Sequence, residues 1–185
     1  MVHTLYTIGY EAWPVQQRFD RIMQVLQQHE VALLVDIRSA PWALPPEESE
    51  MQERCVLAGM TYLWMVELGN PQPEDPNLTV LEAHLAAGDP VPSAYQDLLW
   101  SDEVGLLVPG ISADAVLHDL LAAEWPVNRG LLLLRQLVLA QGDPCCLLCA
   151  CPEYGRCHRR LIAETLRDRY FFHPEGMMDV RDLTP

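Results

Sequence analysis

The stretch "VALLVDIR" (residues 31–38) is a continuous apolar run closed by two charged side chains. A strand with one exposed face alternates apolar and polar residues, whereas a strand covered on both faces is apolar throughout. The run therefore predicts a strand in the interior of a parallel sheet. Asp36 and Arg38 stand one residue apart at its end, so their side chains share one face of the strand.

The segments on either side of this run alternate between strand and helix patterns. Such alternation predicts an α/β fold, with a mainly parallel β-sheet flanked by helices in a Rossmann-like, three-layer arrangement. We expect a single domain over residues 1–185, because this length suits one hydrophobic core. The predicted strands are 4–9, 31–38, 61–68, 144–151 and 176–183. The predicted helices are 15–29, 49–60 (capped by Ser49 and stopped by Gly59), 78–87, 93–101, 111–124, 129–141 and 157–171.

The chain is strongly acidic, with a net charge of −14 from 26 acidic and 12 basic residues. Proteins that bind nucleic-acid phosphates carry the opposite balance, so a nucleic-acid partner is not expected. The sequence has neither the basic start of a signal peptide nor an apolar run of about 18 residues, so we expect no membrane partner and a cytoplasmic location. The spacing of the six cysteines does not suit a disulfide framework. Nothing in the sequence indicates an oligomeric state.

Ligands of parallel α/β sheets bind beyond the carboxyl ends of the strands. Polar and cysteine residues gather at these predicted ends, and we expect them to line one shared hollow. They are Gly9, Tyr10, Asp36, Arg38, Glu67 and Cys149, with the segment that contains Cys157, His158 and Arg159.

The stretch "LLCACPEYGRCHRR" (residues 147–160) carries the strongest chemical signal and allows several interpretations. Cys146 and Cys149 have the spacing of a redox pair, but residues three apart in a strand point to opposite faces. We therefore expect Cys145 and Cys146 to be core residues.

A metal site is the second interpretation. Cys149, Cys151, Cys157 and His158 offer soft ligands for zinc or iron, and the two cysteines of the strand share a face. Their spacing is not that of paired C-x-x-C knuckles. In the structural alternative, His158 caps the helix that follows.

The third interpretation is a thiolate in an anion site. A helix that begins near Cys157 turns its positive dipole end toward the strand ends, where arginines add further charge. Such surroundings lower the pKa of a thiol and attract an anion. On this hypothesis, Cys149 or Cys151 is the nucleophile, with a small anionic substrate such as a phosphate ester, nucleotide or sulfur oxyanion.

The candidate residues fall into two groups under the thiolate hypothesis. His158 would move a proton, Arg38 and Arg159 would hold the anion, and Asp36 and Glu67 would orient these groups. The catalytic candidates are Cys149, Cys157, His158 and Glu67; the ligand-binding candidates are Gly9, Tyr10, Asp36, Arg38 and Arg159. No cofactor is required, whereas the metal hypothesis needs zinc or iron.

A non-catalytic alternative is a protein-binding module that docks a partner through the apolar loop "APWALPP" (residues 40–46). The sequence alone leaves open whether the protein is an enzyme.

Several motifs resemble, in order, those of the family called domain of unknown function 488. They are "TIGYE", "LLVDIRSAPW", "YLWMVELG", Tyr95 in "SAYQDLL" and "LLCACPEYGRCHRRLIAETL". The resemblance implies a bacterial or archaeal cytoplasmic α/β protein with no established activity. It places Thr7, Gly69 and the candidates above at the family's characteristic positions. Two departures stand out: Cys151 replaces a residue that is usually acidic, and the segment after "VDIRSAP" is apolar and acidic where the family is basic.

A shorter likeness is to rhodanese-type sulfurtransferases. "LLVDIR" is similar to their Asp-x-Arg strand end, and the segment from Cys151 to Arg156 has the span of their six-residue active loop. This likeness implies a loop whose backbone N–H groups cradle an oxyanion or persulfide.

Overall fold

The computed structural model describes residues 2–41, 48–87, 127–141, 144–171 and 176–185. The helices predicted at 93–101 and 111–124, Tyr95 and most of the apolar loop 40–46 lie outside these described residues. No helix among the described residues is long and apolar enough to cross a membrane.

The core of the described chain is a five-stranded sheet in the order β3-β2-β4-β1-β5, and every pairing in it is parallel. All five predicted strands are confirmed, and the fold is α/β as the alternation predicted. The strands are β1 (Val2–Gly9), β2 (Leu33–Asp36), β3 (Thr61–Trp64), β4 (Cys145–Cys149) and β5 (Met177–Asp182).

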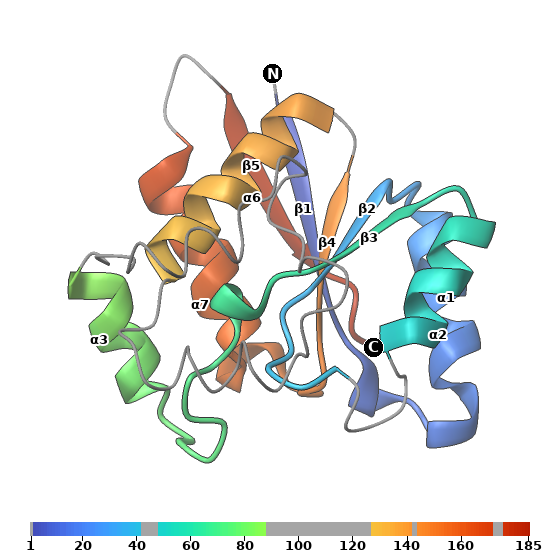
Figure 1. Ribbon diagram of the computed structural model, residues 1–185, viewed down its shortest axis with the longest axis horizontal. Coiled ribbons are helices and arrows are strands. Elements are labelled where there is room, and N and C mark those ends of the chain that lie inside the picture. Colours follow the sequence, from blue (N-terminus) through green and yellow to red (C-terminus); the bar gives the residue numbers. More distant parts are fainter. Residues whose placement is uncertain (1, 42–47, 88–126, 142–143, 172–175) are drawn as a thin grey trace.

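Helices cover both faces of the sheet, which confirms the three-layer arrangement. Figure 1 shows α1 and α2 together on one side of the sheet and α6 and α7 on the other. The helices are α1 (Arg18–Gln28), α2 (Glu48–Leu57), α3 (Thr79–Ala87), α6 (Val127–Gln141) and α7 (His158–Thr165), which continues as a π-helical turn over Leu166–Tyr170.

Several element boundaries differ from the prediction, and two of the differences are informative. The strand predicted at 61–68 ends at Trp64, and the chain then forms a 3-10 turn, η3 (Val66–Leu68). In this turn the Gly69 N–H donates to the Val66 carbonyl at 2.8 Å, so the backbone bonds locally instead of to a neighbouring strand. The prediction that Ser49 caps its helix is wrong, because α2 already begins at Glu48. The stop at Gly59 is confirmed by its φ of +74°, which glycine adopts readily.

The strand order brings the candidate residues together. β4 lies between β2 and β1, with Gly9 paired to Cys149 and Asp36 paired to Leu148. Three strands therefore end side by side, and each continues into a loop at the same edge of the sheet. This edge is where the polar side chains of the site gather.

Candidate metal centre and adjoining pocket

Three cysteines and one histidine form a cluster at the carboxyl end of β4. The cluster consists of Cys149, Cys151, Cys157 and His158, whose ligand atoms all lie within 4.8 Å of one another. The Sγ atom of Cys149 lies 3.4 Å from the Sγ of Cys157 and 3.9 Å from the Sγ of Cys151. Three of the four residues are buried, and Cys151 is half-buried.

The local fold explains why these four residues meet. Cys149 is the last residue of β4, and a loop with one 3-10 turn, η4 (Tyr154–Arg156), returns the chain to the same place. Cys157 is the N-cap of α7, and its sulfur accepts a hydrogen bond from the Arg159 N–H at 3.5 Å. The cap is thus Cys157, and His158 is the first residue of the helix.

The His158 ring is oriented by the neighbouring strand. Its Nε2 lies 3.1 Å from the carbonyl oxygen of Ile37, a contact in which the ring N–H donates. Nδ1 then faces the sulfurs, at 3.7 Å from Cys149 Sγ and 3.9 Å from Cys157 Sγ. A histidine that donates one N–H to a carbonyl and turns its other nitrogen to a soft cluster has the arrangement typical of a metal ligand.

The pKa values of the three thiols shift in different directions. Hydrogen bonds from Cys149, Cys157 and His158 lower the pKa of Cys151, whereas the bond to Cys151 and burial raise the pKa of Cys149 to about 12. The hydrogen bonds to the same sulfurs raise the pKa of Cys157. Burial acts to lower the pKa of His158, but its bonds to Cys151 and Cys157 raise it to about 9. These shifts favour Cys151 as the thiol of the cluster that loses its proton most readily.

Arg159 supports the cluster from behind. Its side chain is fully buried and donates to the Cys151 carbonyl, to Thr184 Oγ1 at 3.1 Å and to Asp182 Oδ1 at 3.4 Å. Gly9 makes this contact possible, because a Cβ there would overlap the Cys151 carbonyl and lie 2.7 Å from Arg159 Nη1. Neither Gly9 nor Arg159 lines the pocket described next, and both hold the Cys151 loop in position.

A second group of polar residues lies at the end of β2. Both carboxylate oxygens of Asp36 accept hydrogen bonds from the Arg38 guanidinium, and Asp36 also accepts from the Tyr62 hydroxyl at 2.7 Å. Arg38 Nη1 in turn lies 3.4 Å from the Tyr10 oxygen. All four residues are buried. The ion pair is therefore fixed in place by the fold.

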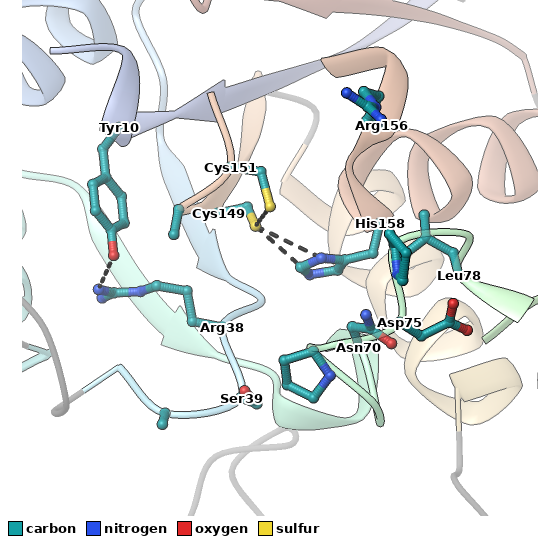
Figure 2. A pocket seen from close by; sticks show the side chains of 14 residues that line it. Tyr10, Arg38, Ser39, Asn70, Asp75, Leu78, Cys149, Cys151, Arg156 and His158 are labelled. Atoms are coloured by element: carbon teal, nitrogen blue, oxygen red, sulfur yellow. Dashed lines mark hydrogen bonds between the residues drawn. The ribbon is translucent and has the colours of Figure 1, made fainter. Parts of the chain in front are cut away.

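A cavity of about 360 Å³ opens between these two groups. Figure 2 shows Tyr10 and Arg38 on one side of it, and Cys149, Cys151 and His158 on the other. Of the nine residues predicted for catalysis or ligand binding, four line this cavity: Tyr10, Arg38, Cys149 and His158. The others, Gly9, Asp36, Glu67, Cys157 and Arg159, are not in its lining.

Glu67 lies apart from the cavity, under α6. A Cβ on Gly130 would come within 2.5 Å of Glu67 Cγ, which shows how closely this helix covers the carboxylate. Burial raises the pKa of Glu67 to about 7. The position suits a buried packing residue of η3.

Three residues in or next to the pocket were not among the candidates from the sequence. Asn70 and Asp75 line it from the loop after β3, and Tyr62 supports it through Asp36. Asp75 had a usable signal, since it precedes Thr79 by four residues and caps α3, accepting from the Thr79 N–H at 2.7 Å. Tyr62 and Asn70 depend on strand register and loop path, which local patterns do not contain.

The fold and the cluster define a class of protein: a parallel α/β protein with a thiol- and imidazole-rich site at the carboxyl edge of its sheet. Comparison with protein families then gives one match, in which the model described as Domain of unknown function DUF488 covers residues 18–86. This match supports the DUF488 assignment and spans α1, β2, α2, β3 and most of α3. The cluster lies outside the matched segment. No curated protein and no solved structure matches the chain.

Proposed function

We propose that the protein binds a soft metal ion, zinc in the first place and iron as the alternative, through Cys149, Cys151, Cys157 and His158. The observation that carries this proposal is the mutual approach of the four ligand atoms to within 4.8 Å. Four residues of this kind in such close contact match the Cys₃His set of zinc sites.

The spacing of the sulfurs supports a tetrahedral centre. With zinc–sulfur bonds of about 2.3 Å, the sulfurs at the corners of a tetrahedron lie about 3.8 Å apart. The two sulfur–sulfur distances from Cys149, 3.4 Å to Cys157 and 3.9 Å to Cys151, bracket this edge. Small movements of side chains would therefore suffice to receive the ion.

The surroundings of the cluster support the same proposal. A buried thiolate is costly unless a positive charge compensates it, and a divalent ion would compensate several at once. The bond from His158 to the Ile37 carbonyl would hold the imidazole as a ligand. Cys149, Cys151 and His158 line the cavity, so the ion would lie beside it.

Elemental analysis of the purified full chain tests this proposal. We expect about one metal equivalent per chain, since one four-ligand cluster holds one ion. Cobalt(II) exchanged into the site should give the sulfur-to-metal charge-transfer absorption of thiolate coordination. Both signals should fall strongly in Cys149→Ser and Cys157→Ser, but not in Cys55→Ala, a matched control at a buried cysteine of α2 outside the cluster.

Two results would count against a metal centre. One is wild-type protein that binds neither zinc nor cobalt when either is supplied after reduction of the thiols. The other is equal metal binding by the wild type and the Cys149→Ser variant.

A thiol site for a small anionic substrate is the second candidate, and the position of Cys151 favours it. Cys151 is half-buried and shares the cavity with Arg38 and His158, whereas Cys149 is only 2% exposed. Cys151 is therefore a better nucleophile candidate than Cys149. On this candidate, iodoacetamide at pH 7 labels Cys151 far ahead of the other cysteines in protein shown to be metal-free. Uniformly slow labelling of the cysteines would contradict a nucleophilic thiol in this cavity.

A further inference from the structure

The cavity beside the cluster has one wall that the metal proposal does not use. Tyr10 and Arg38 line it, but neither belongs to the Cys/His cluster. We propose that this cavity binds a small organic carboxylate, with its charged group against Arg38 and Tyr10 and its carbon skeleton against the apolar wall.

The orientation of the Arg38 guanidinium is fixed by its neighbours. Its side chain is only 6% exposed, and Asp36 fixes the guanidinium through both carboxylate oxygens. A guanidinium whose orientation is fixed pairs well with a carboxylate, because it is weakly hydrated and loses little side-chain entropy on binding. The Tyr62 bond to Asp36 extends this support to β3.

Tyr10 adds a second donor beside the first. Its oxygen accepts from Arg38 Nη1 at 3.4 Å, so the hydroxyl hydrogen itself is not spent in that contact. Burial raises the pKa of Tyr10, which keeps the phenol protonated at neutral pH. The guanidinium carbons of Arg18 and Arg38 each lie 5.3 Å from the centre of the Tyr10 ring, and these cation–π contacts help to fix its orientation. Two donors 3.4 Å apart suit the two oxygens of one carboxylate.

The rest of the cavity argues for a single charge and an apolar body. Ala40, Pro73, Pro76 and Leu78 contribute apolar surface, and the volume of about 360 Å³ suits a small molecule. Asp75 also lines the cavity, and its pKa is lowered by the backbone N–H bond from Asn77, so it stays negative. Arg156 and His158 also line the cavity, but Asp75 and the acidic chain repel a doubly charged phosphate more than a monocarboxylate.

Calorimetric titration of the full chain with acetate, benzoate and phenylacetate tests the proposal. Each acid is paired with its neutral amide, and phenyl phosphate is included as a doubly charged probe. We expect at least one acid to bind saturably at about 10 mM or below, at least about tenfold tighter than its amide and tighter than phenyl phosphate. Tyr10→Phe, which keeps the ring, should weaken that acid about tenfold. The matched control Arg54→Gln, an arginine of α2 outside this cavity, should leave it unchanged.

The outcomes separate this proposal from that of the metal centre. Titrations on protein as purified and after chelation should both show carboxylate binding, since Arg38 and Tyr10 are not metal ligands. Absence of binding by all three acids would overturn the proposal, as would equal binding of acid and amide, tighter binding of phenyl phosphate, or full affinity in Tyr10→Phe. Metal content, measured on the same samples, decides the other proposal independently.

Discussion

At the end of β1, Gly9 gives the Cys151 loop room that a residue with a side chain would take away. Its φ of −118° is open to any residue, so the requirement comes from close packing rather than from backbone conformation. The Cys151 carbonyl and the Arg159 guanidinium occupy the space where a Cβ would stand. Gly9 therefore acts as a spacer under the cluster.

Gly9→Ala should destabilise the protein by about 1–3 kcal/mol, because the added methyl group overpacks a site formed by backbone and a buried arginine. It should also weaken metal binding, since the Cys151 loop must move. Denaturant unfolding and metal titration measure the two effects. Gly155→Ala is the control, because a Cβ there meets nothing within 4 Å. Equal behaviour of the two variants would show that the loop adapts freely.

Glu67 gives a pH-dependent prediction away from the cluster. Its pKa is about 7 in the fold against an ordinary value of 4.5, because burial disfavours the charged form. Between these two pH values the folded chain holds a proton that the unfolded chain has released, so stability falls as pH rises and the loss is complete above about pH 7.

Glu67→Gln removes this dependence. The variant should gain stability relative to the wild type as pH rises from 5 to 8, by up to about 3 kcal/mol for a shift of this size. Urea unfolding at several pH values measures the difference. Glu53→Gln, at an exposed position of α2, should follow the wild-type profile. Parallel profiles for wild type and Glu67→Gln would contradict a raised pKa at this carboxylate.

At the scale of elements, α7 begins at a residue with two tasks. Cys157 accepts the Arg159 N–H as helix cap and also places its sulfur 3.4 Å from that of Cys149. Serine is among the best capping residues and alanine among the poorest, while neither supplies a thiolate. The two substitutions can therefore separate capping from metal binding.

In metal-free protein, Cys157→Ser should be more stable than Cys157→Ala by about 1 kcal/mol, the usual value of a cap. Both variants should lose the cobalt charge-transfer signal to a similar degree. Thermal unfolding after chelation gives the first comparison, and cobalt titration gives the second. If the alanine variant matched the serine variant in stability, the sulfur would not be acting as a cap.

Sequence patterns predicted the strands themselves better than the strand ends or the strand order. Continuous apolar runs predicted β2 and β4 because strands covered on both faces carry no polar positions. The ends of the elements were less accurate, as at Trp64, because local turn bonds decide where a ladder stops. The position of β4 between β2 and β1 could not be predicted, since its partners lie more than a hundred residues away along the chain.

At the scale of the whole molecule, the cluster ties together segments from both ends of the described chain. The Cys151 loop is held by Arg159, which also donates to Asp182 at the end of β5 and to Thr184 beyond it. Cysteine and histidine at a strand end predicted which residues form this cluster. Its supports could not be predicted, because Thr184 and Tyr62 reach it only through the arrangement of the sheet.

Removal of the metal should lower the melting temperature of the full chain, because an ion that binds only the folded state stabilises it by mass action. A differential scan with and without a strong chelator measures the shift, and added zinc should restore it. Cys149→Ser provides the comparison, since it should show almost no response to chelator. A wild-type melting temperature that changes neither with the chelator nor with added zinc would indicate that the cluster folds and persists without an ion.

The place of β1 in the sheet has a consequence for synthesis on the ribosome. Both of its neighbours, β4 and β5, are synthesised after residue 144. The first strand therefore leaves the ribosome long before either neighbouring strand is available to pair with it. Until then the backbone N–H and C=O groups of β1 have no native strand to pair with, and neither Cys149 nor Cys157 has been synthesised. Chaperones that shield nascent strands should accordingly matter more for the yield of this chain than for proteins whose early strands pair with each other.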